Sequence, residues 1–232
     1  MNRIDELGLN LTTVKNSVQD ACERAGRKFE DVTIIAVTKT WPASDVDLLA
    51  QLGVTDVGEN RDQEAKAKKS EVSSTNLTWH AIGQIQTNKV KSIIQWADVV
   101  HSIDRLELVE VFAKQLAHAG RSIDVFVQVN LDEVPRDNRG GASTDEALAL
   151  AQAVLSNEAF RLRGVMGVAP LHGDANRAFE HLASVSQALM QLDPTASAIS
   201  AGMSDDYEIA IKNGATHLRL GSLILGHRTY SG

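Results

Sequence analysis

Lys39 is the residue whose setting most directly suggests covalent chemistry. It follows the apolar run Ile34 to Val37, which has the composition of a buried strand. A lysine at the end of such a strand would enter a half-buried site, where burial disfavours the charged ammonium form. A neutral amine in that place would be a nucleophile toward carbonyl groups. The alternative from position alone is a surface lysine that forms an ion pair.

Two glycine-containing segments could bind a phosphate group. Ser200 and Gly202-Met203 follow one strand-like run and lead into Ser204-Asp205, which resembles a helix cap, and Gly221-Ser222 follows the next run. Backbone amides freed by glycine, hydroxyl groups and a helix amino terminus are groups that hold phosphate. Either segment alone could be an ordinary turn. Together with Lys39 they suggest a phosphorylated aldehyde as the ligand.

Arg219 lies two residues before Gly221, so strand alternation would place both on the same face. A guanidinium that points inward needs a partner. One alternative is a buried ion pair with a carboxylate on a neighbouring strand. The other is a contact with a pyridine nitrogen of the ligand, which the guanidinium would keep unprotonated, so that the ring would be a weak electron sink.

Two histidines lie in strand-like runs. We interpret His80 as a core residue, whereas His101, at the end of its run, is open to a role in the site.

A regular alternation of strands and helices must position these residues. Strand-like runs occur at residues 32–38, 54–57, 77–82, 99–102, 124–130, 162–168, 197–200 and 216–220. Helix-like stretches occur at residues 43–51, 62–69, 87–96, 105–119, 145–156, 176–191 and 205–213. Another helix is expected over residues 2–25, and its expected buried face consists of Leu7, Leu9, Leu11, Val14, Val18 and Cys22. The pattern predicts an α/β fold, a single (β/α)8 TIM-type barrel with an extra amino-terminal helix, as one domain over residues 1–232. An open doubly wound sheet is the alternative.

The charge balance argues against nucleic acid as a partner. The formal net charge is -7, and binding to a phosphate backbone depends on clustered Lys and Arg. The basic residues Lys66, Lys68 and Lys69 are flanked by Glu64 and Glu71. Mixed charge at helical spacing is typical of a solvated helix face, which is how we interpret this stretch.

The cysteine content and the termini bear on location. Cys22 is the only cysteine, so an intrachain disulfide is not available, and residues 1–10 lack the pattern of a secretion signal. We therefore expect a cytoplasmic protein. No apolar run approaches the roughly 18 residues that a membrane-spanning helix needs, so no membrane partner is expected. Segment 131–143, rich in charge, Pro and Gly, is expected to be a flexible loop after the fifth strand.

Seven strings, spread over nearly the whole chain, have the order and composition of a known family. They are Ala36-Val37-Thr38-Lys39-Thr40; Gly58-Glu59-Asn60 with Gln63-Glu64; Trp79-His80-Ala81-Ile82-Gly83 with Gln86-Thr87-Asn88-Lys89; His101-Ser102-Ile103-Asp104; Leu162-Arg163-Gly164-Val165-Met166; Ser200-Ala201-Gly202-Met203-Ser204-Asp205-Asp206; and Arg219-Leu220-Gly221-Ser222 with Gly226 and Arg228. In these strings the sequence resembles the pyridoxal phosphate homeostasis protein family. Any one string is weak evidence, and their occurrence in order is strong.

The resemblance implies a barrel similar to the amino-terminal domain of alanine racemase, with pyridoxal 5'-phosphate (PLP) as cofactor, held as a Schiff base on Lys39. It implies that the phosphate is bound by residues matching Ser200, Gly202, Met203, Gly221 and Ser222, that Arg219 lies near the ring nitrogen, and that Asn60 lines the pocket. Ser222 stands where the family commonly has Thr, and Leu225 where it commonly has Phe. Because Ser keeps the hydroxyl, we expect phosphate binding to survive. The loop at residues 131–141 differs from the family's lysine-bearing version, which leaves its role open.

Two functions from different classes remain open. One is intracellular PLP homeostasis and carriage, with PLP-dependent apo-enzymes as recipients, no catalytic residue and no metal. The other is a PLP-dependent amino-acid racemase, which would need a second acid or base on the face opposite the lysine. The two tyrosines, Tyr207 and Tyr230, are not obvious candidates. We therefore favour the carrier, as a monomer. A third interpretation is a barrel for another phosphorylated metabolite, with Lys39 as a countercharge.

Overall fold

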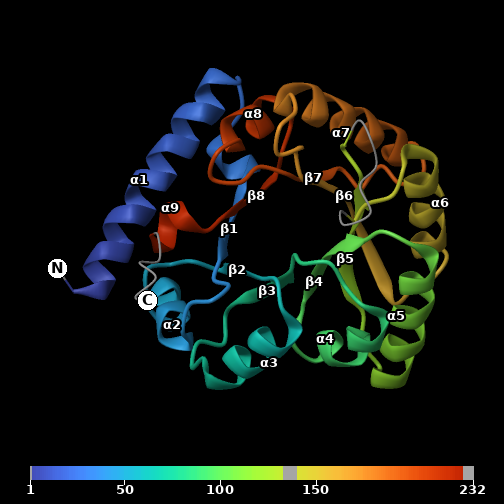
Figure 1. Cartoon of the computed structure of the whole chain (residues 1–232), viewed down its shortest axis with the longest axis horizontal. Coiled ribbons are helices and arrows are strands. Elements are labelled where there is room, and N and C mark those ends of the chain that lie inside the picture. The colour runs from blue at the N-terminus through green and yellow to red at the C-terminus, as the bar shows by residue number, and fades with distance from the viewer. Residues whose placement is uncertain (1, 133–139, 227–232) are drawn as a thin grey trace.

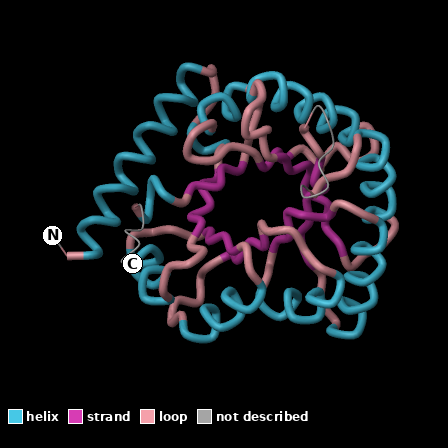
Figure 2. Tube along the Cα trace, viewed as in Figure 1, coloured by secondary structure: helices cyan, strands magenta, loops and turns pink. Residues whose placement is uncertain are grey.

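The computed structural model describes residues 2–132 and 140–226, and its strands form a closed parallel barrel in the order β1 to β8. The strands are β1 (Thr33–Val37), β2 (Asp56–Glu59), β3 (Thr78–Ala81), β4 (Val99–Ile103), β5 (Ile123–Val129), β6 (Phe160–Gly167), β7 (Ala198–Ser200) and β8 (His217–Leu220). Figure 2 shows them as an inner ring with the helices outside. Closure is made by pairing of β1 with β8. The predicted barrel is thereby confirmed, and the open sheet is wrong.

The helices follow the strands and cover the outside of the barrel (Figure 1). They are α1 (Arg3–Arg24), α2 (Ala43–Gln51), α3 (Asp62–Glu71), α4 (Val90–Trp96), α5 (Leu106–Ala119), α6 (Thr144–Leu155), α7 (Ala175–Met190), α8 (Tyr207–Lys212) and α9 (Ser222–Leu225). Short 3-10 turns lie at Phe29–Asp31 and Thr87–Lys89. In the described part of the chain, none of these helices has the length and apolar character needed to cross a bilayer.

The extra helix α1 lies against α8 and α9 at the outside of the ring (Figure 1). The side chain of Asn2 accepts a hydrogen bond from the amide of Asp5 and so caps its first turn. One residue of the predicted buried face was wrong, because Leu9 is 57% exposed. The helical period of 3.6 residues joins Leu7 to Leu11 and Val14 and turns Leu9 to the opposite face.

Strand alternation divides the core into two layers. Side chains inside the barrel include Val99, Phe126 and Met166, which form one apolar cluster. The alternate residues of each strand, such as Trp79 beside the inward-facing His80, point outward and pack in the main core between the strands and the helices. The barrel interior is therefore filled by side chains, and ligands have access only at its ends.

Most element boundaries differ from the sequence-based expectation by one to three residues, and two of these differences lie next to polar residues of the barrel mouth. The second strand was expected at residues 54–57 and runs from Asp56 to Glu59, so that it ends on the buried carboxylate of Glu59. The helix expected at residues 205–213 begins only at Tyr207, because Met203 and Asp206 form a turn before it. The predicted flexible loop lies partly outside the described residues, as do Arg228 and Tyr230.

Candidate functional site

Lys39 lies in a turn directly after β1, at the carboxyl end of the barrel, as predicted. Lys39 is exposed, so the expectation of a half-buried lysine was wrong. Within residues 2–132 and 140–226, Lys39 forms no salt bridge. The amine is therefore accessible at the mouth of the barrel.

A buried polar cluster holds the turn that carries Lys39. Thr38 donates its hydroxyl to Glu59 Oε1 at 2.6 Å, and Lys68 donates its ammonium to the carbonyl oxygen of Thr38 at 2.8 Å. The amide of Thr40, which has a φ of 68°, donates to Glu64. Because the residues on both sides of Lys39 are fixed in this way, its backbone position is fixed as well.

The role of Lys68 was missed at the level of sequence. Its side chain is 4% exposed and forms ion pairs with Glu59 and Glu64, so the interpretation as part of a solvated helix face was wrong for this residue. Burial raises the pKa of Glu59, and the hydrogen bonds from Lys68 and Thr38 act against that rise. The buried carboxylate at the end of β2 needs a cation, and helix α3 supplies it.

The loops after β7 and β8 carry a group of hydrogen-bond donors that we call the cup: the amides of residues 204, 205, 222 and 223 and the hydroxyls of Ser204 and Ser222. Ser222 donates its hydroxyl to that of Ser204 at 3.0 Å and so joins the two loops. In the described chain, the amides of Ser204, Asp205, Ser222 and Leu223 donate to no acceptor. Unpaired amides and hydroxyls at one point make a site for an anion.

Gly202 shapes the first of these loops. Its φ is +93°, and a Cβ atom there would lie 2.8 Å from the Cβ of Ala210. Met203 is 40% exposed, and its amide is taken by the Asp206 carboxylate at 2.6 Å. Burial raises the pKa of Asp206, although the bond from the Met203 amide acts against it. Gly202 is therefore required by the turn, and the Met203 amide is already paired in this arrangement.

Arg219 points into the barrel and is 5% exposed. Its guanidinium donates to the hydroxyl of Ser200 at 2.6 Å and to the carbonyl oxygen of Gly167 at 2.9 Å. Burial lowers the pKa of Arg219 to about 10, with Asp206 acting in the opposite direction. No carboxylate forms a salt bridge with it among the described residues, so the buried ion pair that the sequence left open is absent.

A chain of hydrogen bonds continues from Arg219 across the interior. Ser200 lies 2.9 Å from His101 Nδ1, His101 Nε2 lies 2.9 Å from His80 Nδ1, and His80 Nε2 lies 3.0 Å from Asp56 Oδ1. Burial, with His80 and Arg219 nearby, holds the pKa of His101 well below its ordinary value of 6.5. His80 is buried, as predicted, but it is a linked polar residue rather than a simple core residue.

The hydroxyl of Ser200 is engaged inside the barrel, and its predicted contact with the phosphate stays a prediction. Ser200 is fully buried, and its hydroxyl lies between Arg219 and His101. Alternating positions in β3 and β4 would have placed His80 and His101 inside the barrel, which is the signal that the sequence contained. The contact from β4 to β7 could not be read from the sequence, because these strands are not neighbours.

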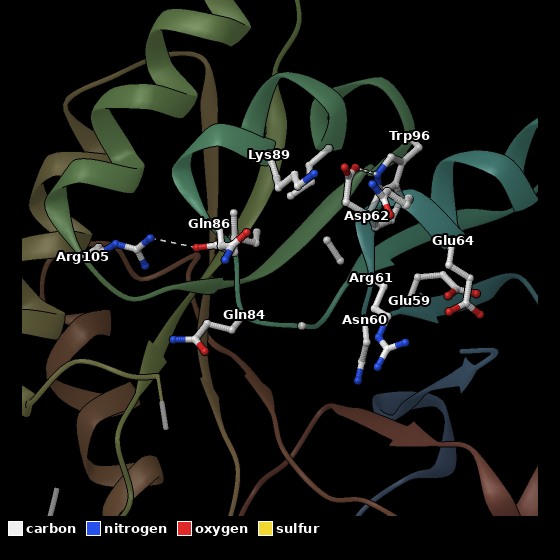
Figure 3. Close-up of a pocket in the computed structure, with 15 residues that line it drawn as sticks. Glu59, Asn60, Arg61, Asp62, Glu64, Gln84, Gln86, Lys89, Trp96 and Arg105 are labelled. Atoms are coloured by element: carbon white, nitrogen blue, oxygen red, sulfur yellow. Dashed lines mark hydrogen bonds between the residues drawn. The ribbon is translucent and has the colours of Figure 1, made fainter. Parts of the chain in front are cut away.

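Asn60 lies beside the barrel mouth in a separate cleft of about 700 Å³. Figure 3 shows its side chain, with that of Arg61, pointing away from Trp96 and Lys89. Lys39 does not line this cleft. The predicted contact of Asn60 with the same ligand as Lys39 stays a prediction.

Barrel closure brings the predicted halves of the site together. Ala36 pairs with Leu220, and a Cβ atom on Gly221 would lie 3.5 Å from the Cβ of Val37. Lys39, two residues beyond Val37, therefore lies at the same end of the barrel as the Gly221-Ser222 loop. The arrangement can hold an anion in the cup and present a free amine beside it.

Comparisons with known proteins agree with this geometry. A family model described as "Alanine racemase, N-terminal domain" matches residues 9–229. The chain is 37% identical over 243 residues to the pyridoxal phosphate homeostasis protein of Mycobacterium leprae, covering 97% of this chain and 94% of that protein. It is 33% identical over 234 residues to the protein of the same name from Escherichia coli, covering 98% and 99%.

Solved structures give the same result. PipY from Synechococcus elongatus, in a structure without PLP, is similar with a TM-score of 0.84 and 29% identity, covering 95% of this chain and 100% of that chain. A structure of PipY with PLP bound gives a TM-score of 0.82 and 28% identity, with the same coverage.

Proposed function

The chain belongs to the pyridoxal phosphate homeostasis protein family, and from this premise we propose that it binds PLP covalently at Lys39 and serves PLP homeostasis without strong catalysis of its own. The observation that carries the proposal is the pairing of β1 with β8, because the turn that contains Lys39 and the loop that begins at Gly221 then follow neighbouring strands at the same end of the barrel. An amine and an anion cup at one barrel mouth suit an aldehyde that carries a phosphate.

The residues present fit a phosphate group. The oxygens of a phosphate act as hydrogen-bond acceptors. Four backbone amides have no acceptor within the described chain and could donate to them: those of Ser204, Asp205, Ser222 and Leu223. The Ser222 hydroxyl would take the place of the Thr that the family commonly has. We assign the phosphate to this cup, together with Gly221, and we assign Gly202 to the shape of the loop. Met203 and Asn60 would border the ligand.

The guanidinium of Arg219, inside the barrel, can donate a hydrogen bond to an acceptor atom of a ligand bound at the mouth. It is a buried cation that donates to Ser200 and Gly167, and a guanidinium has five N–H groups. We assign one of the remaining donors to the pyridine nitrogen. When bound, PLP supplies an aldehyde carbon that combines with an amine and a ring that can accept electron density. A guanidinium against the nitrogen keeps it unprotonated and makes that acceptance weak, which favours holding PLP over catalysis.

The alternative of a racemase finds less support. Tyr207, the one tyrosine in the described residues, lies on the outside in α8, and its hydroxyl is 3.4 Å from Glu208. Burial raises the pKa of Tyr207. We assign no catalytic residue. We further propose that residues 1–232 form a single domain, that the protein is a cytoplasmic monomer, and that PLP-dependent apo-enzymes receive the PLP.

Borohydride trapping tests the covalent role of Lys39. The protein incubated with PLP should show a visible absorption band that borohydride removes, and peptide mapping should find the reduced label on Lys39. Lys39→Ala should lose the band while its circular dichroism is unchanged. Lys66→Ala is the matched control, because Lys66 is an exposed lysine of α3. A label on another lysine would refute the assignment.

Incubation of the loaded protein with single enantiomers of amino acids separates carrier from racemase. The carrier leaves their optical rotation unchanged over many hours. Inversion at ordinary enzyme rates of about 1 to 1000 per second would overturn the proposal.

A further inference from the structure

A buried chain of hydrogen bonds runs from Arg219 through Ser200, His101 and His80 to Asp56. Five strands contribute to it, since Asp56 lies in β2, His80 in β3, His101 in β4, Ser200 in β7 and Arg219 in β8. It starts near the amino end of β2, where the side chain of Asp56 is 20% exposed, and crosses the interior to the side that carries the mouth. Neither the amine of Lys39 nor the phosphate cup requires such a chain.

With both imidazoles neutral, the two ends of the chain set the direction of every bond, because the guanidinium of Arg219 only donates and the carboxylate of Asp56 only accepts. A guanidinium only donates, so Ser200 Oγ must accept from Arg219. The hydroxyl proton of Ser200 then needs an acceptor, and His101 Nδ1 lies 2.9 Å away. Nδ1 of His101 is therefore unprotonated, and the ring is a neutral imidazole with its proton on Nε2.

The proton position on His80, the second imidazole of the chain, follows in the same way. His101 Nε2–H donates to His80 Nδ1, so the proton of His80 is on Nε2 and points to Asp56 Oδ1. Asp56 ends the chain as an ionised acceptor; burial alone would raise its pKa, but the hydrogen bonds from His80 and Thr55 lower it. Each internal member donates once and accepts once, so the chain has one consistent arrangement.

The plane of the central ring is also fixed. His101 stacks on Phe126 with ring centroids 4.4 Å apart and an interplanar angle of 16°. Stacking and two hydrogen bonds together leave His101 one orientation. Its Nδ1 is thus held where it can take the Ser200 proton.

We infer that His101, supported by His80 and Asp56, is a positioning residue that orients the Ser200 hydroxyl as an acceptor for Arg219 and so aims the guanidinium at the ring of the ligand. Ser200 in this arrangement acts on the ring through Arg219 and does not bind the phosphate. The inference rests on the proposed function, which it deepens by assigning a role to three residues inside the barrel.

Paired ligands test the role of Ser200. Pyridoxal has the ring and aldehyde of PLP but no phosphate. Ser200→Ala should weaken equilibrium binding of PLP and of pyridoxal by the same factor, about tenfold, the scale of a lost hydrogen bond to a charged group. Ser222→Ala is the contrasting variant, and it should weaken PLP only. A loss confined to PLP in Ser200→Ala would overturn the inference.

Three histidine variants test the positioning role. His101→Leu should show the loss seen in Ser200→Ala, and the double variant should show no further loss, because both act on one bond. His101→Asn keeps an acceptor near the place of Nδ1 and should recover most of the affinity. His217→Leu removes another imidazole, half-buried and in edge-to-face contact with Phe126 outside the chain, and it should leave affinity unchanged. Equal losses in His101→Leu and His217→Leu would overturn the inference.

Nitrogen NMR of the protein without PLP gives a readout that needs no variant and no ligand. Between pH 6 and 8, His101 should show the neutral pattern with the proton on Nε2. A charged His101, or a proton on its Nδ1, would contradict the deduced direction. If the wild-type protein binds no PLP, the proposed function fails, while this measurement still decides whether the chain is arranged as inferred.

Discussion

Acidification should destabilise the fold through imidazoles that are buried without charge. Burial, with His80 and Arg163 nearby, lowers the pKa of His217 from 6.5 to about 4. Between those values the unfolded chain binds a proton that the folded protein does not bind, so stability falls as the pH falls through this window. At about 1.4 kcal/mol per pKa unit, the full effect of His217 is about 3 kcal/mol. His101, whose pKa is also depressed, adds an effect of the same sign.

The assay is urea denaturation at a series of pH values from 7.5 to 4.5, followed by circular dichroism. His217→Leu cannot bind the proton, so its free energy of unfolding should fall less steeply than that of the wild type, by about 2 kcal/mol over this range. The difference between the proteins is needed because Glu59, whose pKa is raised by burial, acts in the opposite direction. Parallel stability curves for the two proteins would mean that His217 has the same pKa in the folded and unfolded states.

The other predictions concern residues around the mouth. Lys68→Met leaves the buried carboxylate of Glu59 without its cation and should lower the free energy of unfolding by about 3 to 5 kcal/mol. Lys66→Met, on the exposed face of the same helix, should change the free energy of unfolding by less than about 0.5 kcal/mol. Similar values for the two variants would contradict the burial of Lys68. Gly202→Ala should lower the free energy of unfolding, measured by urea denaturation, by about 1 to 3 kcal/mol more than Gly53→Ala does, because both glycines have positive φ but only Gly202 is crowded by its neighbours. Equal losses in the two variants would show that crowding is unimportant. Ser222→Ala should weaken PLP retention by about 1 to 3 kcal/mol in equilibrium dialysis, and unchanged retention would remove its hydroxyl from the phosphate cup.

The barrel could be predicted from the sequence because one pattern repeats along the whole chain. Apolar runs such as the one before Lys39 alternate with amphipathic stretches, and a fold that closes β1 on β8 satisfies all of them. Once closure is assumed, Lys39 and Gly221 must lie at the same end. The predicted burial of Leu9 was wrong because residues two positions apart lie on nearly opposite sides of a helix, so Leu7 and Leu11 face the core and Leu9 faces solvent.

The polar interior could not be predicted, because it depends on contacts between residues far apart in sequence. Lys68 looks like its exposed neighbour Lys66 until β2 places a buried carboxylate beneath it. The hydroxyl of Ser200 looks available for phosphate until His101 and Arg219 are found on either side of it. Which polar side chains meet inside a barrel is set by the stagger of its strands, and no local pattern records that stagger.

Pairing of β1 with β8 also constrains when the protein can first bind its ligand during synthesis. The amine comes from the beginning of the described chain and the Gly221-Ser222 loop from its end, so a nascent polypeptide still missing β8 has only half of the pocket. A contact between such distant segments forms late in folding. The pocket at the barrel mouth is therefore complete only after almost the entire barrel has left the ribosome.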